Sequence, residues 1–388
     1  MRSCPSHRNA TIPLSRSDTV AAVGNKNPLM RSDATLSRRS FLKSAAGFAT
    51  AAAGVGADDK TAPLQTRGVV LMPSDLSLKD WPERAKAAGI NTIGLHWTRK
   101  LNALCDFVAG DDGAHFLARC KELGIAVEYE LHAMGDLLPR ELFQKDPALF
   151  RMDDKGQRTA DTNCCPHSPA ALDLIAEKAA GYARRLPPTT HRYFFWPDDG
   201  GQWCRCPKCT DLAASDQALL VENHILRALR RHDARATLSH ISYAHTLLAP
   251  QQVKPESGVF LEFAPIDRDY TKPITDRDAK IQSRPRYAHP ETNAGYLDVL
   301  EANMKLFGVE HTQVLEYWLD VSRFSRWKRP AVKLPWNAEI CRADIAAYRA
   351  LGVPHITTFA VYMDADYVKL HGDPQPVLLE YGAALNPS

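Results

Sequence analysis

The stretch AHFLARCKELGIAVEY, residues 114–129, contains the repeating unit that decides the fold. Residues 114–123 have the apolar spacing of an amphipathic helix, Gly124 is of the type that commonly ends a helix, and residues 126–129 have the apolar pattern of a short buried strand. The same order of helix, glycine and strand recurs at Gly89, Gly308 and Gly352. The chain is therefore predicted to consist of repeated βα units, which form parallel sheets.

Eight such units are predicted. The apolar runs lie at residues 68–72, 92–95, 126–129, 193–196, 237–241, 259–263, 313–317 and 356–361, and the helical patterns at 81–88, 114–123, 170–185, 215–231, 294–307 and 339–351. Eight units predict a (β/α)8 TIM-type barrel, with residues 134–169 and 264–293 as long βα loops. A doubly wound open sheet is the alternative, but the first strand lacks a glycine-rich phosphate turn and neither nucleotide-binding motif occurs.

The N-terminal segment is predicted to be a twin-arginine export signal. Arg38 and Arg39 precede a small, mildly apolar run at residues 44–55, and cleavage is expected after Ala57. Residues 1–57 are then a leader and signal, and residues 58–388 a single barrel domain; Met30 is an alternative start to Met1. The mature protein is expected to be periplasmic or secreted, with the twin-arginine translocase as its partner during export. No other run approaches the roughly 20 apolar residues of a membrane anchor.

Composition excludes several classes of protein. The 388 residues include 48 Lys and Arg against 45 Asp and Glu, and 45% are hydrophobic. Without residues 1–57 the net charge changes from +3 to −3. This balance argues against a nucleic-acid-binding protein, and the apolar fraction is that of an ordinary globular chain.

Carboxylates, histidines and aromatic residues occur where the strands are predicted to end, which is where barrel enzymes place their functional groups. These positions are Asp75, His96, Trp97, His132, Asp136, Asp198, Asp199, Tyr243, His245, Glu262, Asp267, Arg268, Glu316, Asp320, Tyr362, Asp364 and Asp366. Glu262 and Glu316 each interrupt an apolar strand, so both are expected to point into the barrel as paired or catalytic groups. Trp97, Trp203, Trp318 and Trp327 offer flat faces that suit sugar rings, although such residues also serve in packing. A group of carboxylates matches the needs of glycoside hydrolysis, which requires no cofactor.

Four cysteines form a second candidate site. A CxCxxC motif, Cys204, Cys206 and Cys209, follows the fourth strand, and Cys165 lies in the preceding long loop. Four sulfurs suit a structural Zn²⁺ site, whereas an oxidising compartment suits one or two disulfides; both alternatives remain open. A metal centre that takes part in the chemistry would need an open coordination position, which four sulfur ligands would close.

Several motifs together resemble a bacterial family of unknown function, built as a glycoside-hydrolase-like barrel and distantly similar to alpha-glucuronidases and beta-N-acetylhexosaminidases. They are LHA (131–133) with LLP (137–139), CPHSP (165–169), PDDGG (197–201) running into CxCxxC, SYAH (242–245) and PIDRDY (265–270). The PDDGG block with CxCxxC is the specific part, and the resemblance spans roughly residues 130–362. It implies an exported enzyme that acts on polysaccharide.

The resemblance also implies roles for individual residues. Asp199 would be the general acid, Glu316 the nucleophile or base, and Glu262 the alternative to Glu316. The expected substrate contacts are Asp198, His132, Tyr243, Arg268, Trp97 and Trp318. Arg268 would hold a uronate carboxylate in a two-pronged contact, or else pair with Asp267, Asp269 or Glu262.

A carbohydrate-binding barrel without activity is the competing hypothesis. Its carboxylates would only bond to sugar hydroxyls. Carboxyl groups about 5–5.5 Å apart would predict a retaining hydrolase and groups about 6.5–9.5 Å apart an inverting one. The lack of such a pair among Asp199, Glu262 and Glu316 would favour the binding protein.

Overall fold

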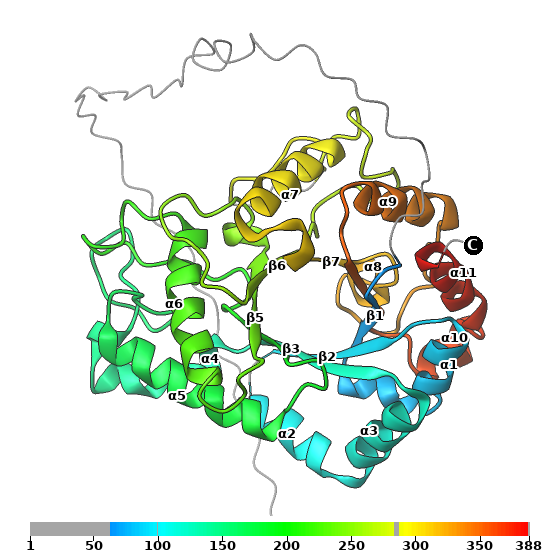
Figure 1. Cartoon of the computed structure of the whole chain (residues 1–388), viewed down its shortest axis with the longest axis horizontal. Coiled ribbons are helices and arrows are strands. Elements are labelled where there is room, and N and C mark those ends of the chain that lie inside the picture. Colours follow the sequence, from blue (N-terminus) through cyan, green and yellow to red (C-terminus); the bar gives the residue numbers. More distant parts are fainter. Residues whose placement is uncertain (1–62, 99, 283–286, 387–388) are drawn as a thin grey trace, which may run out of the picture. The chain divides into compact units, whose positions relative to one another are not determined.

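The computed structural model describes residues 63–98, 100–282 and 287–386. Within them, eight parallel strands form a closed barrel in chain order, with β1 pairing β8 (Figure 1). The strands are β1 (Thr66–Leu71), β2 (Thr92–Thr98), β3 (Ala126–His132), β4 (Arg192–Trp196), β5 (Thr237–Ser242), β6 (Val259–Phe263), β7 (Thr312–Glu316) and β8 (His355–Phe359). This confirms the predicted (β/α)8 barrel and all eight predicted strands.

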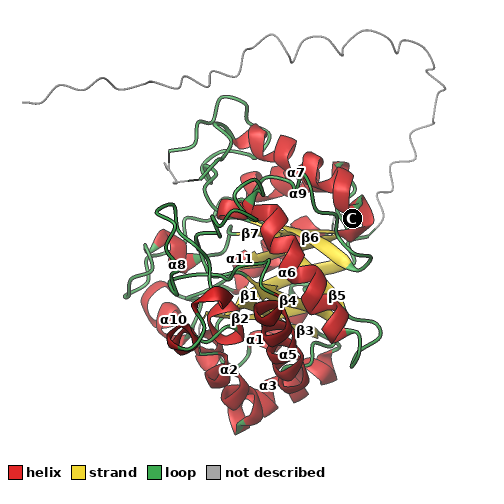
Figure 2. Ribbon diagram, turned by 90° about the vertical axis from the view of Figure 1, so that its left-hand side faces the viewer, coloured by secondary structure: helices red, strands yellow, loops and turns green. Residues whose placement is uncertain are grey.

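Helices surround the barrel, as a view turned by 90° also shows (Figure 2). They are α1 (Trp81–Ala87), α2 (Leu101–Ala109), α3 (Asp111–Leu123), α4 (Met134–Leu137), α5 (Pro169–Arg185), α6 (Ala214–Leu229), α7 (Asn293–Phe307), α8 (Val321–Phe324), α9 (Ala338–Ala350), α10 (Ala365–His371) and α11 (Gln375–Leu385). Short 3₁₀ turns lie at Pro73–Ser77, Arg140–Gln144, Pro147–Leu149, Ala244–Thr246 and Val309–His311. All six predicted helices are present. The connection between β5 and β6 has only the turn at Ala244–Thr246 in place of an α-helix.

The four glycines predicted to end helices have the backbone conformation that this role requires. Gly89, Gly124, Gly308 and Gly352 have φ angles of +72°, +68°, +91° and +82°. Residues with a Cβ rarely adopt this region, whereas glycine does so without steric cost. These four positions therefore turn the chain from a helix toward the next strand, as the sequence pattern predicts.

Two apolar cores lie on the two sides of the barrel wall. The larger one packs outward-facing strand residues such as Val69, Ile93 and Val314 against the helices. The smaller one fills the barrel with inward-facing residues such as Val70, Phe194 and Leu315. Because both faces of a parallel strand are buried, most strands carry apolar residues on both sides, and alternate residues face opposite sides of the barrel wall.

The barrel interior also contains a polar layer around Arg192. Its guanidinium donates to Gln313 Oε1 at 2.5 Å and approaches His355 Nδ1 at 2.7 Å. Its Nε lies 3.8 Å from the buried carboxylate of Glu128. This layer lies at the start of β4, β7 and β8, so it closes the end of the barrel opposite the strand carboxyl ends.

The predicted signal and leader, residues 1–57, lie outside the described residues. Among the residues that are described, no helix is long and apolar enough to cross a membrane.

Candidate functional site

A cavity of about 290 Å³ opens at the carboxyl ends of the strands. Strand-end residues form its floor and walls, namely Met72, His96, His132, Trp196, Ile241, Tyr317 and Phe359. Loop residues complete it, including Asp199, Tyr243, Asp320 and Trp327. This is the end of the barrel where enzymes of this fold carry their active sites.

Aromatic rings make up much of the cavity. The Tyr317 and Phe359 rings lie 5.3 Å apart, and the His132 ring lies 5.0 Å from that of Trp196. Trp327 lines the cavity from a loop, and the residue is 64% exposed. Flat apolar faces beside polar groups suit a ligand with both kinds of surface, such as a sugar ring.

Two histidines present hydrogen-bond acceptors at this site. His132 Nδ1 lies 2.7 Å from the Pro197 carbonyl, and His96 Nδ1 lies 2.9 Å from that of Glu130. A carbonyl oxygen only accepts, so Nδ1 carries the hydrogen in each ring, and Nε2 of the neutral form has a free lone pair. Burial, together with the nearby His132, lowers the pKa of His96 to about 3, so His96 is neutral at ordinary pH.

Asp199 is the carboxylate most open to the cavity. Its side chain is 59% exposed, and its Oδ1 lies 3.9 Å from His132 Nε2. The Tyr243 hydroxyl donates to the same oxygen at 2.9 Å. Burial and the Asp199 carboxylate raise the pKa of Tyr243, so the hydroxyl keeps its proton and remains a donor. One carboxylate oxygen is therefore held in place by this bond.

The preceding residue, Asp198, has a different role. Its carboxylate pairs with Arg140 and accepts a hydrogen bond from the Asn163 backbone N–H at 2.6 Å. Its own backbone N–H donates to Asn163 Oδ1 at 3.0 Å. The Asp198 carboxylate, expected to be a substrate contact, thus ties the loop after β4 to the loop after β3.

Glu316 was expected to point into the barrel, but it does not. It lies in the layer between β7 and α9, fully buried, where its carboxylate accepts from Arg268 Nε at 3.1 Å and from the Tyr348 hydroxyl at 2.5 Å. Arg268 is also buried and donates to Asp344 at 2.5 Å. Neither Glu316 nor Arg268 lines the cavity, so the structure does not bring them to the site where the nucleophile or base and the uronate contact were expected. Arg268 is in an ion pair, but with partners other than those expected.

Glu262 does point into the barrel, but it lies beneath the cavity floor. It is fully buried and accepts hydrogen bonds from Trp196 Nε1 at 2.8 Å and from Gln313 Nε2 at 3.1 Å. Burial raises its pKa to about 8. Since the Trp196 indole lines the cavity, a ligand there meets the indole rather than Glu262. Glu262 is therefore not among the residues that line the cavity, where the alternative nucleophile or base was expected.

The expected aromatic contacts Trp97 and Trp318 also belong to the outer core. Trp318 donates from Nε1 to Asp344 at 2.9 Å and packs beside Tyr348 and Tyr381. Trp97 packs against the same outer core. The residues that do line the cavity on those strands are one position away, His96 and Tyr317. The alternation of side chains along each strand could have identified these two residues, since residues two apart share a face.

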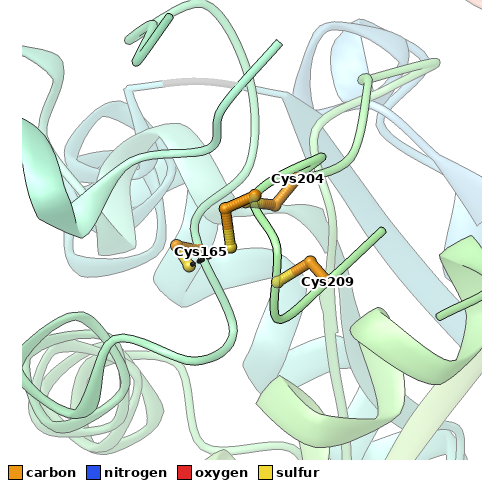
Figure 3. A group of neighbouring side chains, drawn as sticks. Cys165, Cys204 and Cys209 are labelled. Atoms are coloured by element: carbon orange, nitrogen blue, oxygen red, sulfur yellow. Dashed lines mark hydrogen bonds between the residues drawn. The ribbon is translucent and has the colours of Figure 1, made fainter. Parts of the chain in front are cut away.

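The four predicted cysteines come together in space. The Sγ atoms of Cys165, Cys204, Cys206 and Cys209 all lie within 4.8 Å of one another, and all four residues are buried. Figure 3 shows Cys165, Cys204 and Cys209 converging from separate parts of the chain. The group has the donor set and closeness that a metal ion needs.

Comparison with known proteins places the chain in a family. The model of a domain of unknown function, DUF4838, matches residues 92–288, which is just over half of the chain. The chain belongs to the DUF4838 family. This confirms the resemblance inferred from the sequence motifs. No curated protein matches the chain.

Solved structures similar to this DUF4838 protein include glycoside hydrolases. The beta-galactosidase from Rahnella sp. R3 has a TM-score of 0.53 and 14% identity, with 84% of this chain and 56% of that chain covered. A catalytic mutant of Gan42B, a GH42 beta-galactosidase from G. stearothermophilus, has a TM-score of 0.51 and 12% identity, with 84% and 57% covered. The chain thus spans just over half the length of these enzymes. The likeness establishes a glycoside-hydrolase-like barrel fold.

Proposed function

We propose that the protein is a glycoside hydrolase that acts on polysaccharide in the barrel cavity, with Asp199 protonating the departing oxygen. The observation that carries this proposal is the placement of Asp199. Its carboxylate is exposed at an aromatic-lined cavity and is oriented through one oxygen by Tyr243. A general acid must reach the leaving oxygen, and the second carboxylate oxygen of Asp199 is available for that contact.

The rest of the cavity supports sugar recognition. The Nε2 atoms of His96 and His132 accept hydrogen bonds, which sugar hydroxyls donate, while the Trp196 and Phe359 rings cover apolar faces. Among the described residues that line the cavity, none is Lys or Arg. None of these described residues offers a Lys or Arg partner to a uronate carboxylate, so we propose a neutral or acetamido sugar in place of a uronic acid.

Asp320 is the second carboxylate in this proposal, since neither Glu262 nor Glu316 reaches the cavity. It lines the cavity from the start of α8 and accepts from Ser322 Oγ at 2.5 Å and from the Arg323 N–H at 3.1 Å. Burial raises the pKa of Asp320. A pair of carboxyl groups in different environments is the requirement for acid and base roles at one pH.

A hydrolysis screen tests the proposal. The purified full-length chain is incubated with neutral, acetamido and uronate-bearing polysaccharides, beside Asp199→Asn, Tyr243→Phe and the surface control Asp173→Asn. Wild type and control should release sugar from a neutral or acetamido substrate. Asp199→Asn should lose at least about 100-fold in kcat, and Tyr243→Phe less, because general acid catalysis contributes about 10²–10⁴. Equal turnover by Asp199→Asn and wild type would refute the role of Asp199.

A carbohydrate-binding protein without activity is the second candidate. The observation that favours it is the position of Glu262 and Glu316, which removes both strand carboxylates from the cavity. Binding of a polysaccharide by the wild type, with no sugar released across the panel, would establish this function instead.

We also propose export by the twin-arginine pathway, on the basis of Arg38 and Arg39 and the run that follows them. Cell fractionation of the full-length chain tests this. The change of both arginines to Lys should hold the protein inside the cell, whereas Arg16→Lys should not. An unchanged distribution would refute the proposal.

A further inference from the structure

The cysteine group joins two loops that are separate in sequence. Cys165 lies shortly before α5, in the connection from β3, whereas Cys204, Cys206 and Cys209 lie between β4 and α6. All four side chains are buried, with their sulfur atoms close together, and Figure 3 shows three of them, Cys165, Cys204 and Cys209. No disulfide links them, and their thiols are free.

The spacing of the sulfurs matches tetrahedral coordination. Zinc binds thiolate sulfur at about 2.3 Å, so the edge of a ZnS₄ tetrahedron is about 3.8 Å. Cys165 Sγ and Cys206 Sγ lie 3.8 Å apart, and every pair in the group lies within 4.8 Å. A disulfide needs about 2.05 Å between its two sulfurs. It does not require two further sulfurs to lie at tetrahedral spacing around them.

The surroundings of the sulfurs suit thiolates. The Met152 backbone N–H donates to Cys204 Sγ at 3.3 Å, and the Arg158 guanidinium lies 3.8 Å from the same atom. His167 Nδ1 lies 3.2 Å from Cys209 Sγ. Four thiolates around Zn²⁺ have a net charge of −2, and buried negative charge needs such donors and a nearby cation.

The backbone of the CxCxxC loop is held by a buried amide. Gln217 on α6 accepts from the Cys204 N–H at 3.0 Å and donates to the carbonyls of Cys204 at 3.1 Å and Cys209 at 3.3 Å. The loop is therefore shaped before a metal binds, which lowers the entropy cost of bringing the ligands together.

We infer that Cys165, Cys204, Cys206 and Cys209 bind one Zn²⁺ in a closed structural site that fixes the loop carrying Asp199. Four protein ligands leave no open coordination position, so the metal does not touch substrate. The connection to the cavity is short. Asn163, two residues before Cys165, donates to the Gln202 carbonyl and bonds to Asp198, so the metal and this network clamp the segment 198–209 from both ends.

Metal analysis of the full-length chain, produced with zinc supplied, tests the site. We expect about one zinc per chain in the wild type and in the control Cys164→Ser, whose cysteine adjoins Cys165 but lies outside the group. Cys206→Ser should lose at least about tenfold in zinc content. X-ray absorption of the wild type should show four sulfurs at about 2.3 Å, and this result does not depend on whether the variant folds. Iron in place of zinc, or fewer than four sulfur ligands, would overturn the inference.

Alkylation of the denatured, chelated chain without reductant separates the metal from disulfides. All four cysteines should react at once in a zinc protein, and protection until a reductant is added would overturn the inference. Hydrogen exchange tests the positioning role. Chelation should speed exchange in segments 150–165 and 198–212 and leave the barrel strands unchanged. Unchanged exchange in both segments would refute the link to the Asp199 loop.

Discussion

The change Glu316→Gln separates a structural carboxylate from a catalytic one. In the structure Glu316 is fully buried and accepts from Arg268, from Tyr348 and from the Tyr317 N–H at 3.3 Å. Removing one partner of a buried ion pair costs about 3–5 kcal/mol because the other charge is left without compensation. Arg268 keeps Asp344, so we expect the lower end, about 3 kcal/mol.

This loss converts to a measurable shift in melting temperature. The unfolding entropy of about 2.1 cal/mol/K per residue gives about 0.7 kcal/mol per kelvin for about 320 ordered residues. The Tm of Glu316→Gln should therefore fall by about 4 °C, measured by calorimetry with urea unfolding as a second probe. The matched control is Glu310→Gln, whose carboxylate is 71% exposed and 3.7 Å from His311, and which should change stability by less than about 0.5 kcal/mol.

Activity provides the second half of this test. Because Glu316 lies behind the barrel wall, folded Glu316→Gln should keep the turnover or the binding of the wild type. A Glu316→Gln variant that has the same Tm as the Glu310→Gln control yet loses all turnover would refute this reasoning and restore Glu316 as a catalytic group.

Two further predictions concern stability. Burial raises the pKa of Glu262 to about 8, so the folded state keeps a proton that the unfolded chain releases above its usual pKa near 4.5. Wild-type stability should therefore fall as pH rises from 5 to 8, and Glu262→Gln should remove on the order of 3 kcal/mol of this fall in urea titrations; equal pH slopes would contradict it. Gly382 on α11 leaves no room for a Cβ, which would lie 1.7 Å from the Ala88 carbonyl oxygen, so Gly382→Ala should cost more than about 3 kcal/mol. By contrast, Gly181 on α5 has open space, and Gly181→Ala should stabilise by about 0.5–1 kcal/mol; thermal melts of the two variants with the same sign would show the packing argument to be wrong.

Much of the fold could be predicted because its signals are local. The helix at residues 114–123, Gly124 and the strand at 126–129 each depend on neighbours within a few residues. The cysteines were also accessible from sequence, because the βα order brings the loop before α5 next to the loop after β4. Asp199, His132 and Tyr243 follow strand ends, and a barrel brings all strand ends to one rim, where these residues do line the cavity.

Three of the side chains expected at the cavity but found outside it share one cause. Glu316, Trp97 and Trp318 were expected there from their position along the chain alone, whereas Arg268 lies in the loop after β6. In a barrel strand the next residue faces the opposite side of the wall, so an error of one position exchanges the cavity for the outer core. Glu262 has the correct face, but its depth beneath Trp196 depends on how far β4 and β6 are staggered.

By itself the sequence determined the eight βα units, the helix ends and the rim on which functional groups gather. These features follow from hydrophobic periodicity and from the glycines that end helices, and both depend on residues that are close together along the chain. Only the tertiary structure decided which face of β7 is inside. In residues 313–318 each face of the strand carries both apolar and polar side chains. Both faces of a parallel strand are buried, so no alternation of apolar and polar residues tells the inner face from the outer one. The partners that hold Glu316 on the outer face, Arg268 and Tyr348, are 48 and 32 residues away along the chain. Their contact exists only once the barrel has closed and α9 has packed against it.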